Sequence, residues 1–429
     1  MYILAIIAVF ILGVSIQLFL MFRSWIHGDQ ITLLKLGLGY AKTGELAPIS
    51  KFAPGGAPIP GCLLQLLIGL PLRIWPDYRA PVALIGLFHV ISALLLVSII
   101  LRQTGVRLTL VFLIVYWLSP WRLYHSGFVW EPSFLFLPAA IHFWSVWKLM
   151  DRANLGASAG LTAILVLTSQ LHGSFLILVI LTLLLYIRKS IRINAAGALL
   201  GVVIGAIPLI PTIMAITRGS LHNFLPTQSF IGRGLVTVYP VLRGILYWFR
   251  LGSLDIGRRL RHVIFLDSNW IGDDPARRIL QFAVIVLYAL TVITIILSLA
   301  ASWWFFRRKR PECDLKESWN RLHSYAFNCF LAVVISSAFS PVTIQGWHVV
   351  IALHAASIPL ACWITEKWTK WRRLMQWAIV IFLLLRVPEI IVIGYGNDSF
   401  RKKPFTDSES SQITEQLERI LPENLLKND

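Results

Sequence analysis

Long apolar runs recur from one end of this chain to the other, and polar segments separate them. Each run has roughly 14 to 25 residues, a length suited to an α-helix that crosses a bilayer. Helices satisfy their own backbone hydrogen bonds in hydrocarbon, so the pattern predicts an all-α polytopic membrane protein with about 11 transmembrane helices. The predicted spans are 1–22, 82–101, 108–120, 132–149, 155–169, 173–187, 195–217, 279–304, 324–340, 347–364 and 374–393.

Two long polar loops interrupt this pattern, at 23–81 and 218–278. In the first loop, apolar residues at helical spacing predict a helix over 29–42. The apolar run 61–74 is too short to span a bilayer comfortably, so it predicts an interfacial helix. In the second loop, aromatic residues alternate with Arg243 and Arg250 over 239–251, which also favours a helix lying on the membrane.

Basic residues gather at alternate ends of the runs, and the positive-inside rule places these clusters in the cytoplasm. The spans between two clusters must then cross an even number of times. This parity puts the N-terminus in the cytoplasm and both long loops outside. The prediction is a membrane domain over 1–393 and an outer tail over 394–429 with an amphipathic helix. The basic clusters contain Arg102, Arg107, Lys148, Arg152, Arg188, Lys189, Arg192, Arg307, Arg308, Lys309, Arg310, Lys316, Arg321, Lys367, Lys370, Arg372 and Arg373.

Composition narrows the function classes. A chain that is 57% hydrophobic and 14% charged is not a soluble enzyme. Its four scattered cysteines indicate neither a disulfide framework nor a metal knuckle. The net charge of +18 includes an excess of basic residues in the two outer loops, which the positive-inside rule does not explain for long loops. This excess favours an anionic partner such as a lipid phosphate, with anchoring to lipid headgroups as the equal alternative, and no nucleic-acid partner is expected.

Two carboxylates outside the membrane are candidate catalytic residues, because each lies within a few residues of a predicted span end. They are Asp29 and Glu131. A carboxylate that is half-desolvated at such a place gains basicity, which suits a general base for a hydroxyl acceptor. The alternatives are structural: Asp29 as the N-cap of the following helix, and Glu131 as a cap before Pro132 or as the partner of Arg122 in an ion pair.

Cations and histidines in the outer turns are candidate phosphate or sugar contacts. Lys51 precedes a Pro/Gly-rich hinge at 54–60, Arg122 and His125 share the loop of Glu131, and His172 and His348 lie in later outer turns. Headgroup contacts by Lys51 and ordinary interfacial hydrogen bonds by the histidines are the alternatives. Short spans that meet polar turns over 108–187 also predict a cavity sunk into the outer leaflet.

This arrangement resembles the GT-C superfamily of polyprenyl-phosphate-sugar glycosyltransferases, above all the bacterial branch that contains aminoarabinose transferase and the protein O-mannosyltransferases. The similarity lies in an acid after span one, a long first loop with interfacial helices and a second acid in the next outer loop. The segment Trp347-His348-Val349-Val350 running to Pro359 also resembles a late span of that branch. The motifs are short, and the resemblance in topology covers roughly residues 1–365.

The resemblance implies a bacterial inner-membrane glycosyltransferase that acts on the periplasmic face. A sugar on a polyprenyl phosphate would be the donor, and a hydroxyl or phosphate of a lipid, glycan or protein would be the acceptor. Asp29 would be the general base of an inverting transfer, with Glu131 as the second site acid. Lys51, His348 and Arg122 would stabilise the phosphate leaving group.

Two departures from the family pattern concern a metal ion. The family typically has Asp-Glu where this chain has Asp29-Gln30, and Asp where it has Glu131. The lost carboxylate weakens the expectation of a bound divalent metal, which therefore stays open, and no other cofactor is expected. The competing functions are a transporter or flippase, a ligase or polymerase of lipid-linked glycans, and a scaffold. The span centres contain scattered histidines and no repeat is visible, which disfavours a transporter.

Overall fold

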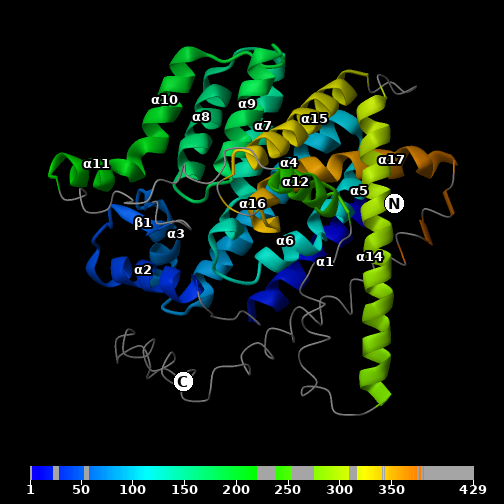
Figure 1. Cartoon of the computed structure of the whole chain (residues 1–429), viewed down its shortest axis with the longest axis horizontal. Helices are drawn as coiled ribbons and strands as arrows, with labels where there is room; N and C mark the ends of the chain where they lie inside the picture. Colours follow the sequence, from blue (N-terminus) through cyan, green and yellow to red (C-terminus); the bar gives the residue numbers. More distant parts are fainter. Residues whose placement is uncertain are drawn as a thin grey trace.

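The computed structural model describes residues 2–22, 29–52, 58–219, 238–253, 275–308, 316–340 and 344–370, with a few single residues beyond. Figure 1 shows a bundle of helices with one small pair of strands at its side. In chain order the elements are α1 (Tyr2–Phe22), α2 (Asp29–Thr43), β1 (Ile49–Phe52), β2 (Pro58–Pro60), α3 (Leu63–Ile74), α4 (Arg79–Thr104), α5 (Val106–Trp117), α6 (Pro120–His125), η1 (Glu131–Phe134), α7 (Phe136–Asp151), α8 (Leu155–Ser169), α9 (Phe175–Ile187), α10 (Ala195–Ala206), η2 (Ile207–Leu209), α11 (Ile210–Thr217), α12 (Val238–Leu251), α14 (Pro275–Arg307), α15 (Lys316–Ala338), α16 (Gly346–Val349), η4 (Val350–Ala352) and α17 (Leu353–Lys370).

Six helical segments of the described chain are long and apolar enough to cross a membrane, and four shorter apolar helices accompany them. This confirms a multi-pass, helical membrane protein, but it does not confirm the predicted count of eleven spans. Prolines interrupt one of the predicted runs, 195–217, in which Pro208 and Pro211 accompany the short η2 turn between α10 and α11. The predicted span 374–393 is almost entirely outside the described residues, as is the tail helix.

The core of the bundle is formed around α5 and α17, which pack against each other. Every residue of α5 from Leu108 to Trp117 is buried, so this helix is surrounded by protein on all sides. Helices α1 and α4 flank α5, and α7 packs against α4. By contrast, α1, α10 and α14 present many exposed apolar side chains, such as Leu4, Leu199 and Ile296, as helices that face lipid do.

The first long loop folds into the two predicted helices and a pair of short strands that was not predicted. The predicted helices 29–42 and 61–74 correspond to α2 and α3, which lie side by side (Figure 1). Two glycines allow this close approach, since a Cβ on Gly37 would lie 2.5 Å from Ile68 Cγ2 and a Cβ on Gly69 would lie 2.5 Å from the Gly37 oxygen. Between the helices, β1 and β2 form an antiparallel pair in which Lys51 lies opposite Ile59.

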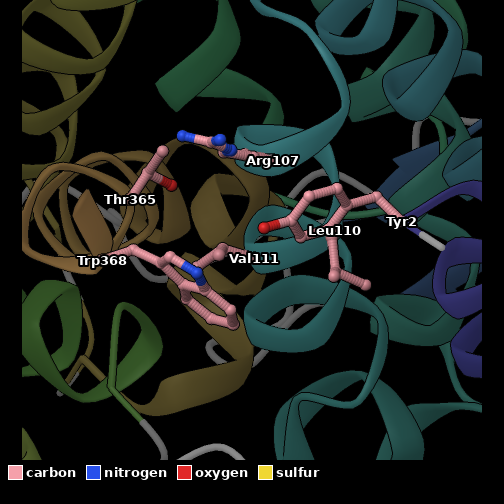
Figure 2. A pocket seen from close by; sticks show the side chains of 6 residues that line it. All are labelled: Tyr2, Arg107, Leu110, Val111, Thr365 and Trp368. Atoms are coloured by element: carbon pink, nitrogen blue, oxygen red, sulfur yellow. The ribbon is translucent and has the colours of Figure 1, made fainter. Parts of the chain in front are cut away.

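One end of the bundle brings together the segments that the charge pattern placed in the cytoplasm. Arg321 of α15 pairs with Asp151 of α7 at 2.5 Å, and Arg308 pairs with Glu366 of α17. At the same end, Figure 2 shows Tyr2, Arg107 and Trp368 around one shallow hollow, with the Arg107 guanidinium 5.8 Å from the Tyr2 ring centroid. The start of α1, the start of α5 and the end of α17 therefore share one face, as the parity argument predicts. We call the opposite face the outer end.

Candidate functional site

Three charged side chains from separate segments converge at the outer end. Asp29 is the first residue of α2, Lys51 lies on β1, and Glu131 is the first residue of η1. The Lys51 ammonium pairs with the Glu131 carboxylate, and its nitrogen lies 3.7 Å from Asp29 Oδ2. One lysine thus joins the two carboxylates that the sequence singles out. We call these three residues the charged cluster.

The two carboxylates have opposite environments. The side chain of Glu131 is 4% exposed and that of Asp29 is 60% exposed, with Lys51 between them at 21%. The sequence predicts that both acids are half-desolvated. Neither is, because Glu131 is buried and Asp29 is open to solvent. A buried carboxylate is tolerated only with a close partner, and Lys51 provides it. Asp29, at the start of α2, also gains from the positive end of the helix dipole.

Two histidines from later outer turns face each other. The rings of His172 and His348 stack with centroids 5.8 Å apart, and the Ser174 hydroxyl donates to the His348 carbonyl at 2.7 Å. Burial above all, together with the charges of His348 and Lys51, lowers the pKa of His172 to about 3. His172 is therefore a neutral imidazole at physiological pH.

The turn that carries His348 is fixed by residues that the sequence analysis did not include among the candidate site residues. Gln345 N–H donates to His348 Nδ1 at 2.9 Å, and the Gln345 side-chain oxygen accepts from Arg243 Nη2 at 2.8 Å and from the Tyr247 hydroxyl at 3.1 Å. Arg243 Nε also donates to the Ile344 carbonyl at 2.6 Å. The predicted helix over 239–251 is α12, and through Arg243 it docks on the site.

Arg122 and His125 lie behind the charged cluster, inside the protein. Arg122 is completely buried, stacks 3.6 Å from the Trp117 ring centroid and donates to Gln17 Oε1 at 2.8 Å. Burial lowers the pKa of its guanidinium to about 9, which leaves it charged at neutral pH. His125 is 1% exposed and stacks on Trp130. The ion pair of Glu131 is with Lys51, not with Arg122, so the structure ties Arg122 to α1 and α5.

The donor set suits a divalent metal ion poorly. No group of three His, Cys, Asp or Glu side chains among the described residues is arranged to hold a metal. In the charged cluster the Lys51 ammonium already occupies the space between the two carboxylates. Divalent ions in such sites need several oxygen ligands, and two carboxylates that share a lysine do not provide them. In the charged cluster the Lys51 ammonium is the cation that the two carboxylates contact.

An open cavity of about 600 Å³ lies against the first loop, between the segment that leads into β1 and helices η2 and α11. The Thr212 hydroxyl of α11 accepts from Gly61 N–H at 2.8 Å and bonds the Pro48 carbonyl, which holds the two walls together. The lining is mostly apolar. It consists of Gly44, Leu46, Pro48, Cys62, Leu66, Ile207, Pro208, Ile210, Pro211, Met214, Ala215 and Arg218.

Comparisons with known proteins bear on the fold. No family model and no curated protein matches the sequence. Among solved structures, the chain is similar to the crystal structure of ArnT from Cupriavidus metallidurans bound to undecaprenyl phosphate. The TM-score is 0.50 at 13% identity, over 92% of this chain and 74% of that chain. At this identity the likeness shows the fold, and it confirms the predicted resemblance to the aminoarabinose-transferase type of GT-C architecture.

Proposed function

We propose that this chain, with its GT-C fold, is a membrane glycosyltransferase that moves a sugar from a polyprenyl phosphate to an envelope acceptor. The observation that carries the proposal is the charged cluster, in which an exposed carboxylate and a buried carboxylate share one ammonium at the outer end. The structural relative is bound to undecaprenyl phosphate, which supports a donor of the same lipid class. The apolar cavity beside β1 has the chemistry to hold part of a hydrocarbon chain.

In this proposal Asp29 is the general base. Its exposed carboxylate accepts the proton of the acceptor hydroxyl as that oxygen bonds to the anomeric carbon of the sugar. The bond between the anomeric carbon and the phosphate oxygen breaks in the same step, so the polyprenyl phosphate leaves with the bonding electrons. Attack from the face opposite the leaving group inverts the anomeric configuration.

Lys51 stabilises the negative charge that develops on the phosphate. An ammonium has three N–H donors, and Glu131 and Asp29 can engage at most two of them. The third can donate to a phosphate oxygen, and a fixed cation in a partly desolvated site stabilises that oxygen in the transition state. Glu131 holds Lys51 in place from the protein side. The neutral His172 imidazole can bind a phosphate or a sugar hydroxyl through Nε2, and His348, whose two nitrogens bond Gln345 and Trp347, positions that turn.

A transfer assay on the purified protein tests this function. The protein in liposomes would be given a polyprenyl-phosphate sugar labelled in the sugar, together with envelope lipid acceptors. The proposal expects labelled acceptor and free polyprenyl phosphate in equal amounts. Movement of intact donor across the bilayer without its consumption would instead show a flippase, and consumption of only diphosphate-linked oligosaccharides would show a ligase or polymerase.

A further inference from the structure

A chain of hydrogen bonds runs through the middle of the bundle, away from the charged cluster. His142 Nδ1 lies 3.0 Å from the Tyr325 hydroxyl, which lies 2.9 Å from His354 Nε2. On its other side, His142 Nε2 lies 2.9 Å from Thr182 Oγ1. His142, Tyr325 and His354 are buried, and the four residues come from four different helices: α7, α9, α15 and α17.

The direction of the bonds at Thr182 and His142 follows from a neighbouring contact. Thr182 Oγ1 donates to the Leu178 carbonyl at 2.8 Å, so it accepts from His142 Nε2–H. With its proton on Nε2, His142 accepts at Nδ1 from the Tyr325 hydroxyl. On its other side the Tyr325 hydroxyl lies within hydrogen-bond distance of His354 Nε2. Each bond of the chain therefore joins one helix to the next.

Three of the four joined helices also carry the site histidines or Glu131 at their outer ends. Glu131 precedes α7, His172 precedes α9 and His348 precedes α17, each within about three helical turns of a member of the chain. Figure 1 shows α7, α9 and α15 next to one another, and α15 also packs against α17. A shift of one helix along its axis would therefore displace one site residue relative to the others.

We propose that Thr182, His142, Tyr325 and His354 are positioning residues that fix the register of α7, α9 and α17 and so align Glu131, His172 and His348. This inference rests on the proposed function for its catalytic consequence, but its geometric part does not. Directional bonds set a register more precisely than apolar packing alone, because sliding one apolar helix along another exchanges one apolar contact for another. Tyr325 is the central residue of this chain of hydrogen bonds, because its single hydroxyl contacts the imidazoles of both His142 and His354.

The test compares Tyr325→Phe with Tyr116→Phe. Tyr116 is also buried, and its hydroxyl bonds Ser92 Oγ at 2.9 Å between α4 and α5. We expect Tyr325→Phe to lower kcat about tenfold or more with little change in the donor KM, because misaligned reacting groups slow the chemical step. Tyr116→Phe should lower the melting temperature by a similar amount and change kcat less than about twofold. Equal effects of both variants on kcat would overturn the proposal.

A second readout does not depend on catalysis. The rings of Trp130 and Trp347, which precede Glu131 and His348, lie 5.3 Å apart. Cysteines at these two positions should be joined quickly by a short thiol cross-linker, and several-fold more slowly when Tyr325→Phe is added. An unchanged cross-linking rate would overturn the positioning role even if the protein transfers sugar. A slowed rate in a protein without transfer activity would refute the proposed function alone.

A milder pair of substitutions covers the case in which Tyr325→Phe does not fold. Thr182→Val keeps the shape of the side chain and removes only the hydroxyl at the end of the chain, whereas Thr182→Ser keeps that hydroxyl. We expect Thr182→Val to slow cross-linking and to lower kcat, both by less than Tyr325→Phe does. Thr182→Ser should keep the cross-linking rate and the kcat of the unsubstituted protein. Identical behaviour of the two variants would contradict the inference.

Discussion

At the scale of single residues, the charged cluster depends on the unequal burial of its two acids. Glu131 needs Lys51 to remain buried as a carboxylate, whereas Asp29 is open to solvent, where the proposed function has it act on the acceptor. Lys51 therefore contacts a buried acid, Glu131, whose charge it stabilises, and an exposed acid, Asp29, which is the proposed base. Substitutions at Lys51 and Glu131 separate these two roles.

Replacing Lys51 with Met should lower both stability and phosphate binding. The change leaves the Glu131 carboxylate buried without its partner, at a cost on the order of 3 kcal/mol. The double variant Lys51→Met/Glu131→Gln should regain most of the lost melting temperature in detergent, because no buried charge remains. It should not regain the affinity for undecaprenyl phosphate, measured by direct titration. Recovery of that affinity in the double variant would show that Lys51 has no phosphate role.

At the scale of elements, the sequence predicts helices well and the details of the first loop poorly. Apolar periodicity locates α2, α3 and α12 to within a few residues. The hairpin is not predicted, because Pro58 and Pro60 lack the N–H groups of a regular strand and signal a hinge. It forms as a short two-stranded pair in which few ladder bonds are needed.

The same limit applies to the candidate site. Charge parity predicts that Asp29, Glu131, His172 and His348 lie on one side of the membrane, but it does not predict which of them are in contact. The sequence also does not show that the Arg122 side chain points into the core. A basic residue in an outer turn gives the same sequence pattern whether its side chain points into the protein or into solvent. The docking of Arg243 on Gln345 joins segments about a hundred residues apart, and neither segment carries a local signal for the other.

The cavity between the first loop and α11 should accommodate part of a lipid chain. Ala215 lines it, and Ala215→Trp would fill much of it with an indole. We expect this variant to raise the KM for a long-chain polyprenyl donor at least fivefold, at an unchanged kcat, and to leave the KM for a short-chain analogue as it is. The matched control is Ile216→Trp, one residue on, where the side chain is 60% exposed. Similar KM values for the two variants would exclude the cavity as a lipid site.

At the scale of the whole molecule, charge separates the two ends of the bundle. Ion pairs such as Arg321–Asp151 and Arg308–Glu366 gather at the basic end, and the charged cluster lies at the other. The positive-inside rule assigns the basic end to the cytoplasm, so we propose that sugar transfer takes place on the periplasmic side.

This orientation can be measured with single cysteines. Arg152→Cys lies in an exposed position at the basic end, and Glu45→Cys lies in an exposed position of the first loop. A membrane-impermeant maleimide added to intact spheroplasts should label Glu45→Cys and should label Arg152→Cys only after lysis. The reverse labelling pattern would show that the protein has the opposite orientation in the membrane, with the charged cluster on the cytoplasmic side.

The central claim is that a carboxylate at position 29 activates the acceptor for sugar transfer, and the most direct measurement is the transfer rate of Asp29→Asn. Asparagine keeps the size of the side chain and cannot accept the proton, so kcat should fall at least about a hundredfold. Glu45→Gln, which neutralises an exposed acid of the same loop, should keep the full rate. If Asp29→Asn transfers sugar from the polyprenyl phosphate as fast as Glu45→Gln, the assignment of the base is wrong.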